Sequence, residues 1–214
     1  DLIDGGAGGD VADGSQGNDT IVLGDGANFA FAGGDNDTVT GGADADVLMG
    51  QAGNDVLTSL GGADNVLGGD GNDTLAAGEG ADNVLGEVGN DSLDAGGGAD
   101  VVNGGSGVDQ MAGGAGSDVF VISALASGTS AATPDVITDF QGAGTSGAGD
   151  QDYLLLQTAS GNLGTASFTH LGAGLWQFAD GLNSTFVRIL DGSASPITAL
   201  LGPGFADTSD FGIF

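Results

Sequence analysis

Residues 68–76 read GGDGNDTLA, and this nine-residue stretch sets the pattern for more than half of the chain. Steps of nine residues from Asp73, in either direction, reach fourteen positions without an insertion or deletion, and thirteen of them hold aspartate. We call these positions the rungs: Asp1, Asp10, Asp19, Asn28, Asp37, Asp46, Asp55, Asp64, Asp73, Asp82, Asp91, Asp100, Asp109 and Asp118. Two residues after each rung lies an apolar residue, from Ile3 to Phe120. A Gly-Asn-Asp-rich flexible linker would keep neither the phase nor the apolar position, so the repeat predicts a stacked structure.

The residue before the rung alternates between two kinds, which indicates that two nine-residue units make one turn of about 18 residues. One column holds Asn18, Asn36, Asn54, Asn72 and Asn90. The other holds Ala27, Ala45, Ala63, Ala81 and Ala99. A turn made of two units has two edges, and each edge then carries one column. We call them the Asn edge, which contains Asp73, and the Ala edge, which contains Asn28.

The charge of the chain excludes several classes of partner. It has 30 acidic residues and a single basic one, Arg188, which gives a formal net charge of −29. No basic patch exists to neutralise phosphates, so nucleic acid is excluded and anionic membrane surfaces are disfavoured. There is no cysteine, so neither disulfides nor thiolate zinc sites are expected. No apolar run is long enough to predict a transmembrane helix. Metal ions are the remaining counter-charge for the carboxylates.

The pattern of residues 68–76, repeated as GGAGSDVFV at residues 113–121, resembles the RTX (repeats-in-toxin) calcium-binding family. The resemblance implies an all-β fold, a right-handed parallel β-roll in which each unit forms a turn and a short strand and calcium lies between stacked turns. Calcium takes about six to eight oxygen ligands from carboxylates and carbonyls. The fourteen rungs are therefore the expected metal ligands. Seven rungs on each edge leave six gaps, so at most about twelve ions fit, and Asn28, which lacks a charge, is expected to weaken its two gaps.

The apolar content of each unit is too small to fold the roll alone. One buried Val or Leu contributes about 1.5–3 kcal/mol, whereas ordering nine residues of backbone costs about 9–18 kcal/mol. Stacked carboxylates without a cation would also repel one another. We therefore expect the roll to be unfolded without calcium and to fold when calcium binds.

The repeat ends at Ile122, which predicts a roll at residues 1–122 and a β-rich cap at residues 123–214. Residues 135–140 (DVITDF) and 150–156 (DQDYLLL) are similar to the segment that follows the repeats in serralysin-type and other RTX proteins. That likeness raises calcium binding as one interpretation of its aspartates, and turn or strand-end positions as the other. The aspartates concerned are Asp135, Asp139, Asp150 and Asp152.

The remainder of the cap shows short alternating patterns that predict strands at residues 167–171, 175–179 and 184–190, with a hairpin turn at 180–183. We expect these strands to close the open end of the roll. Residues 196–201 form a short segment for which the sequence leaves a helical and an extended conformation open. The terminal residues 207–214 (DTSDFGIF) are similar to the acidic-then-hydrophobic end of type I secretion signals in this family, and an ordinary final strand is the alternative.

No catalytic constellation is visible, so the chain is predicted not to be an enzyme. His170 is the only histidine, and there is no H-E-x-x-H, G-x-S-x-G or P-loop motif. We interpret His170 and Trp176 as cap residues. Ice binding, which calcium rolls can show, is disfavoured because no threonine column lies two residues before the Asn column.

The resemblance implies a secreted, extracellular bacterial protein that the type I secretion machinery exports and that extracellular calcium then folds. A structural or cell-surface role follows, as a surface layer, adhesin or filament, with self-assembly or a cell-surface polysaccharide as the expected interaction. The alternative is the secretion and folding tail of an exported hydrolase, a metalloprotease or lipase whose catalytic domain lies upstream. The chain begins at a rung in mid-repeat, which predicts that it is a piece of a longer polypeptide.

Overall fold

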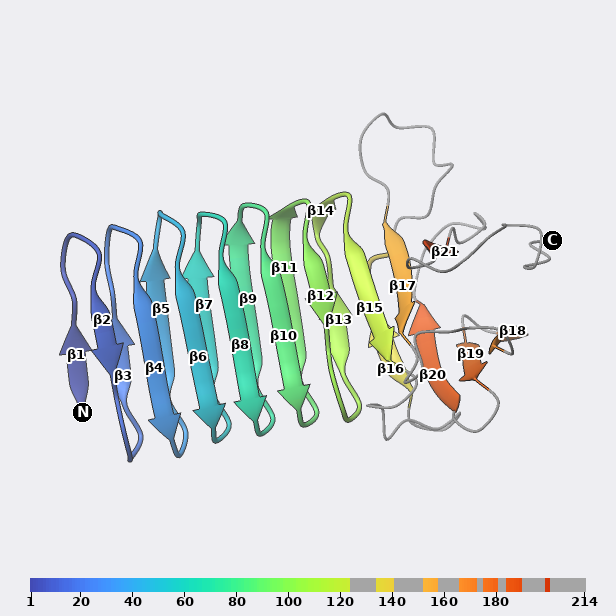
Figure 1. Cartoon of the computed structure of the whole chain (residues 1–214), viewed down its shortest axis with the longest axis horizontal. Helices are drawn as coiled ribbons and strands as arrows, with labels where there is room; N and C mark the ends of the chain where they lie inside the picture. The colour runs from blue at the N-terminus through green and yellow to red at the C-terminus, as the bar shows by residue number, and fades with distance from the viewer. Residues whose placement is uncertain are drawn as a thin grey trace.

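Strands stacked side by side form nearly all of the regular structure. The computed structural model describes residues 1–123, 134–140, 152–157, 166–172, 175–180, 184–189 and 199–200. Within these residues every regular element is a strand and there is no helix (Figure 1). The predicted all-β class is confirmed.

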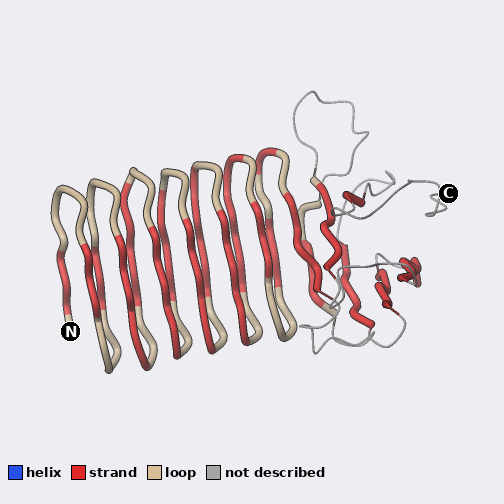
Figure 2. The backbone as a smooth tube through the Cα atoms, viewed as in Figure 1, coloured by secondary structure: helices blue, strands red, loops and turns tan. Residues whose placement is uncertain are grey.

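The repeats wind into two facing parallel sheets. The first sheet contains β1 (Leu2–Asp4), β3 (Thr20–Val22), β5 (Thr38–Gly42), β7 (Val56–Leu60), β9 (Thr74–Glu79), β11 (Ser92–Gly98) and β13 (Gln110–Ala112), with β14 (Ala115–Gly116) beside β11. The second contains β2 (Val11–Asp13), β4 (Phe29–Gly34), β6 (Val47–Ala52), β8 (Asn65–Asp70), β10 (Asn83–Val88), β12 (Val101–Asn103) and β15 (Val119–Ser123). The chain passes alternately from one sheet to the other, and turns line the two edges (Figure 2).

The register confirms that two repeat units make one turn. Leu57 pairs with Leu75 between β7 and β9, and Leu75 pairs with Leu93 between β9 and β11. On the second sheet Val66 pairs with Val84. A slip of one residue would turn every inward side chain outward, so the apolar position two residues after each rung holds this register.

The core is a thin layer between the two sheets, made by the apolar residues that follow the rungs. Each of these residues from Ala12 to Phe120 is buried, and Ile3 at the open end is partly buried. The members of this layer are Ala12, Ile21, Ala30, Val39, Leu48, Leu57, Val66, Leu75, Val84, Leu93, Val102, Met111 and Phe120. A second inward position, four residues after the rung, takes mostly small residues such as Ala77 and Ala95, with the larger Leu23 and Ile122 as exceptions. The layer therefore contains about one substantial side chain per strand.

Two glycines of one unit show why the turns are rich in this residue. Gly71 has φ +150°, where a side chain is strained, and a Cβ there would overlap the carbonyl oxygen of Gly53 in the preceding turn. Gly68 lies against its own rung, and a Cβ on it would overlap Oδ2 of Asp73. Glycine therefore allows close stacking of backbone and brings the rung carboxylate under the turn.

The roll continues past the last nonapeptide. β16 (Asp135–Ile137) pairs in parallel with β13, and β17 (Tyr153–Gln157) pairs in parallel with β15. Ile137 and Leu154 lie in the core with no exposed surface. Phe140 packs against Phe120, with ring centroids 6.0 Å apart. An eighth turn is thus built from residues that do not follow the nine-residue spacing.

The predicted strands of the cap are confirmed where the structure describes them. β18 (Ala166–Gly172), β19 (Leu175–Asp180) and β20 (Ser184–Ile189) form an antiparallel series, and β20 joins the first sheet beside β16. The short strand β21 (Ala199–Leu200) extends the second sheet beside β17, so this part of 196–201 is extended rather than helical. Residues 181–183 and 207–214, where we predicted a turn and a secretion signal, lie outside the described residues.

The core layer predicts a large cost for one deletion. Leu57→Ala removes a fully buried side chain from a layer that cannot collapse without shifting the strand register, and is expected to lower the free energy of unfolding by about 2–5 kcal/mol. Val56→Ala, beside it but 43% exposed, is expected to change it by less than about 0.5 kcal/mol. Thermal denaturation at saturating calcium measures both. Equal losses in the two variants would contradict the assignment of inward and outward faces.

Candidate metal-binding ladders

The rungs lie at the end of each turn, one residue before the next strand, and their side chains point into the roll. Every rung from Asp19 to Asp118 is buried, with at most 3% of its surface exposed. Asp10 is partly buried, and Asp1 at the open end is exposed. The structure thus brings the predicted rungs together in two columns, one on each edge.

One side-chain oxygen of each rung from Asp19 onward accepts a hydrogen bond from the preceding turn. The backbone N–H of Asp55 donates to Oδ1 of Asp73 at 2.8 Å, and the N–H of Asp73 donates to Oδ1 of Asp91 at 2.8 Å. The Ala edge repeats this, since the N–H of Asp64 donates to Oδ1 of Asp82 at 2.8 Å. Each carboxylate therefore leans into the gap between its own turn and the one before.

The second carboxylate oxygen is buried and has no hydrogen-bond partner at ten rungs. These are Asp10, Asp19, Asp37, Asp55, Asp64, Asp73, Asp82, Asp91, Asp100 and Asp109. A buried polar atom left without a partner costs about 1–3 kcal/mol, and more when it is charged. Because this cost recurs at most of the rungs, the folded roll cannot hold ionised carboxylates unless a cation coordinates the unpartnered oxygens.

Burial changes the protonation of these groups when no cation is present. Desolvation, opposed by the backbone N–H of the preceding rung, raises the pKa of Asp55, Asp73, Asp91 and Asp100 to about 6. Repulsion from neighbouring rungs adds to the rise, as Asp109 does for Asp91. The bare ladder at neutral pH therefore holds carboxylates whose charge the fold disfavours.

The donor set fits calcium. The ladders offer oxygen alone, from carboxylates and turn carbonyls, and calcium prefers such ligands at about 2.3–2.6 Å. Among the described residues no three acidic, histidine or cysteine side chains converge on one point. Two carboxylates from stacked rungs must therefore be completed by carbonyl oxygens, a mixture that calcium accepts because its coordination is flexible.

The Asn edge carries a second ladder that runs in the opposite sense. The N–H of Asn72 donates to Oδ1 of Asn54 at 2.7 Å, and the N–H of Asn90 donates to Oδ1 of Asn72 at 2.8 Å. Here the acceptor lies in the earlier turn, whereas in the aspartate ladder it lies in the later one. Adjacent turns are thus bonded in both directions. The Asn column was visible in the sequence, but its hydrogen bonds were not.

Both rung columns gain an eighth member that the nine-residue phase does not predict. The N–H of Asp109 donates to Oδ1 of Asp135 at 3.1 Å, and the N–H of Asp118 donates to Oδ1 of Asp152 at 3.1 Å. Along the chain these pairs are 26 and 34 positions apart, a wider separation than between successive rungs of one edge. Burial raises the pKa of Asp135 to about 7. The sequence named both aspartates only through the likeness of their segments to the one that follows RTX repeats, and an apolar residue lies two positions after each, as in the repeats.

Asp139 has a different place. It accepts the N–H of Gly113 at 3.0 Å and the N–H of Gly114 at 2.7 Å, so it satisfies backbone donors at the start of the last repeat turn. Asp150 lies outside the described residues.

No helix in the described part of the chain is long and apolar enough to cross a membrane.

Comparison with known proteins agrees with this geometry. The family model of the RTX calcium-binding nonapeptide repeat matches the chain in four copies, at residues 1–30, 22–57, 58–93 and 85–120. The chain belongs to this family, whose repeats are structural modules that bind calcium. No curated protein matches it. One similar solved structure is the crystal structure of extracellular lipase LipA from Serratia marcescens, with 15% sequence identity and a TM-score of 0.28. The match covers 86% of this chain and 45% of the lipase chain.

The raised pKa values predict opposite effects of pH with and without calcium. Between the ordinary aspartate pKa of about 3.9 and the folded value of about 6, the calcium-free folded state binds more protons than the unfolded state. Stability of the calcium-free roll should therefore fall as pH rises through this window. Calcium needs ionised carboxylates, so its affinity should rise over the same window.

Circular dichroism of calcium-stripped protein, followed by calcium titration, tests both signs. At pH 5 the strand signal without calcium should exceed that at pH 7, and the calcium concentration at the folding midpoint should be higher at pH 5 than at pH 7. A calcium-free protein that is equally unfolded at both pH values would contradict the role of the rung carboxylates.

Proposed function

We propose that the chain is the calcium-binding RTX domain of a secreted bacterial protein, which folds on extracellular calcium and then serves a structural or cell-surface role. The observation that carries the proposal is the set of ten buried Oδ2 atoms without partners. They recur in register along both edges, so the chain is organised around a row of cations rather than around one site.

The proposed calcium ligands are the thirteen rung aspartates and, beyond the repeats, Asp135 and Asp152. The bound ion supplies the positive charge that the chain lacks. The protein orients each carboxylate through the N–H bond to its Oδ1, which leaves Oδ2 directed into the gap. Asn28 differs from the other rungs because its terminal group is an amide.

Calcium dependence suits export. A chain of charge −29 with a one-residue-thick core gains little from folding where calcium is scarce, as in the cytosol, so it stays unfolded for transport through a type I channel. Outside the cell, calcium neutralises the ladders and stabilises the folded state by mass action. The boundary at 122 and 123 then marks the end of the repeats, and the eighth turn and cap supply an atypical end unit.

A specific surface favours assembly over an isolated role. The outward face of the second sheet is largely apolar, with Val11 at 74%, Phe29 at 48% and Val101 at 38% exposure. Polar residues interrupt it at Asp13, Asn65, Asn83 and Asn103. The residues between them on this face include Phe31, Val47, Met49, Leu67 and Leu85, which are partly buried. The first sheet presents more Thr and Ser, such as Thr38, Thr74 and Ser92. Its exposed large apolar residues are Leu2, Val22, Val56 and Leu60. An apolar face on an otherwise acidic rod supports self-association.

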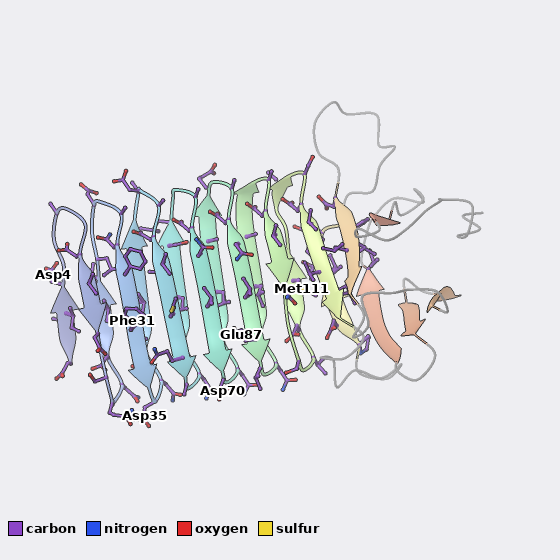
Figure 3. The ribbon with its side chains drawn as sticks, viewed as in Figure 1. Asp4, Phe31, Asp35, Asp70, Glu87 and Met111 are labelled. Atoms are coloured by element: carbon purple, nitrogen blue, oxygen red, sulfur yellow. The ribbon has the colours of Figure 1, made fainter. Side chains whose placement is uncertain are left out.

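Calcium-triggered folding is tested by a matched pair of substitutions in one turn. Asp73→Ala removes a buried rung and is expected to lower the number of bound calcium ions and raise the calcium midpoint of folding. Asp70→Ala removes the same charge from an exposed position at the outer edge (Figure 3) and is expected to leave both unchanged. Native mass spectrometry counts the ions, and circular dichroism follows folding. Strand signal at pH 7 in excess chelator, or equal calcium counts in both variants, would refute the proposal.

Assembly is tested separately. Light scattering of the calcium-loaded protein should show association that increases with concentration, and Phe29→Ser should reduce it. Val56→Ser, an exposed apolar residue on the first sheet, is the control and should leave association unchanged. A persistently monomeric wild-type protein would argue against the structural role while leaving calcium-triggered folding intact.

A further inference from the structure

Asn28 replaces the unpartnered oxygen of an aspartate rung with a hydrogen-bond donor. Its Oδ1 accepts the backbone N–H of Asp10 at 2.8 Å, the same bond that the aspartate rungs from Asp37 to Asp118 make with the preceding turn. Its Nδ2 donates to the carbonyl of Gly26 at 2.6 Å and to that of Gly24 at 3.3 Å. All three bonds lie inside the roll, where Asn28 has no exposed surface.

The shared Oδ1 bond makes Asn28 directly comparable with the aspartates. Because that bond holds the side chain in the same way, the second terminal atom, Nδ2 here and Oδ2 elsewhere, faces the same gap. At an aspartate rung such as Asp64 this atom is a buried oxygen without a partner. At Asn28 it is a nitrogen that already satisfies two carbonyls of its own turn. This turn therefore offers no negative ligand to the gap, and two of its carbonyls accept hydrogen bonds from Asn28.

The next rung on the Ala edge is also complete without an ion. Oδ1 of Asp46 accepts the N–H of Asn28 at 2.9 Å, and Oδ2 of Asp46 accepts the N–H of Gly42 at 2.8 Å. Asn28 leans into the gap that follows Asp10, and Asp46 leans into the gap that follows Asn28, so both of these successive gaps receive a side chain whose terminal atoms are all hydrogen-bonded. Oδ2 of Asp10, on the far side of the first gap, has no partner.

We propose that Asn28 creates a calcium-free interruption in the Ala edge, in which its side-chain amide substitutes for the ion. The calcium column of the Ala edge then begins with the gap between Asp46 and Asp64, so that of the rung aspartates proposed as ligands Asp10 borders no ion in the gaps between rungs. The column of the Asn edge passes the same turns without a break. Ten of the twelve gaps between the fourteen rungs remain for calcium. The inference rests on the proposed function, because it concerns which gaps calcium fills.

The interruption has a physical consequence for the turns around it. Nδ2 carries no negative charge, so Asn28 adds no repulsion when calcium is absent, and in the folded roll its bonds to Gly24 and Gly26 close the turn without an ion. Close stacking of the turns on either side of Asn28 then needs only protein hydrogen bonds. Elsewhere on that edge the same close stacking needs the ion as well.

Reciprocal exchanges at two rungs of the same edge test the proposal on the whole chain. Asn28→Asp restores the missing oxygen and should add one or two calcium ions to the wild-type count. Asp64→Asn introduces the same amide where Leu60 and Gly62 supply the equivalent carbonyls, and should remove at least one ion while the strand signal is retained. Native mass spectrometry of the calcium-loaded protein gives the counts, and circular dichroism confirms folding.

A third variant tests whether the side-chain amide of Asn28 stabilises the folded roll. Asn28→Ala removes the donors without adding a ligand, so it should leave the ion count unchanged and lower the melting temperature of the calcium-loaded roll. Melting of Asn28→Ala at the wild-type temperature would overturn the proposal. So would an unchanged count in Asn28→Asp.

The outcomes also distinguish this inference from the proposed function. A wild-type chain that binds no calcium refutes both. A wild-type chain that binds calcium and folds, with an unchanged count in Asn28→Asp, refutes the interruption alone. Should Asn28→Asp fail to fold, Asp64→Asn decides, because an unaltered ion count or a lost fold in that variant is incompatible with an amide that replaces the ion.

Discussion

The bond from a backbone N–H to the rung carboxylate of the next turn is the interaction on which the structure depends. It holds each aspartate inside the roll, leans it across the gap and leaves its second oxygen without a protein partner, as at Asp73 and Asp91. The same arrangement joins adjacent turns and concentrates negative charge along both edges. The protein therefore builds its framework from groups that cannot remain charged and buried by themselves. A cation resolves this conflict, and the stability of the roll then depends on the calcium concentration of the surrounding solution.

The other features of the roll follow from this constraint. Position 68 requires glycine because the carboxylate of Asp73 lies against it. Position 71 requires glycine because the carbonyl oxygen of the preceding turn occupies the space that a Cβ would need. The inward layer is only one side chain thick, so hydrophobic burial orients the strands and sets their register but leaves the fold dependent on the ladders. The asparagines of the Asn edge add bonds in the opposite sense, which ties the turns together where solvent reaches them. Where one rung becomes an amide, at Asn28, the side chain fulfils by itself the role that the ion has elsewhere.

The periodicity of the sequence predicted the residues of the two ladders but not where the ladders end, because only the repeats keep a constant spacing. Thirteen aspartates and the apolar residues that follow them keep a constant phase, and the stacking of identical turns makes such a phase visible. Asp135 and Asp152 occupy the same structural position after insertions of different length, so periodicity could not find them. Only the likeness of their segments to the one that follows RTX repeats named them, and the apolar residue two positions later is shared by many ordinary strands. The bonds of Asn28 and Asp46 were also beyond prediction, because a missing charge does not reveal which atoms replace it.

The sequence alone determined the all-β class, the pairing of two repeat units in each turn, the inward positions and the two columns of acidic rungs. It could do so because each is a property of spacing, and a stacked repeat converts spacing into position. Only the tertiary structure decided which oxygen of each rung is bonded and which is left over, that the roll extends through β16 and β17, and that Asn28 completes its own turn. Most of these depend on contacts between residues 18, 26 or 34 positions apart, made when the turns lie on one another, and the bonds of Asn28 to Gly24 and Gly26 form within a turn held in that stack. Whether a side-chain atom has a hydrogen-bond partner is decided only in that stacked state, so it is a property of the fold.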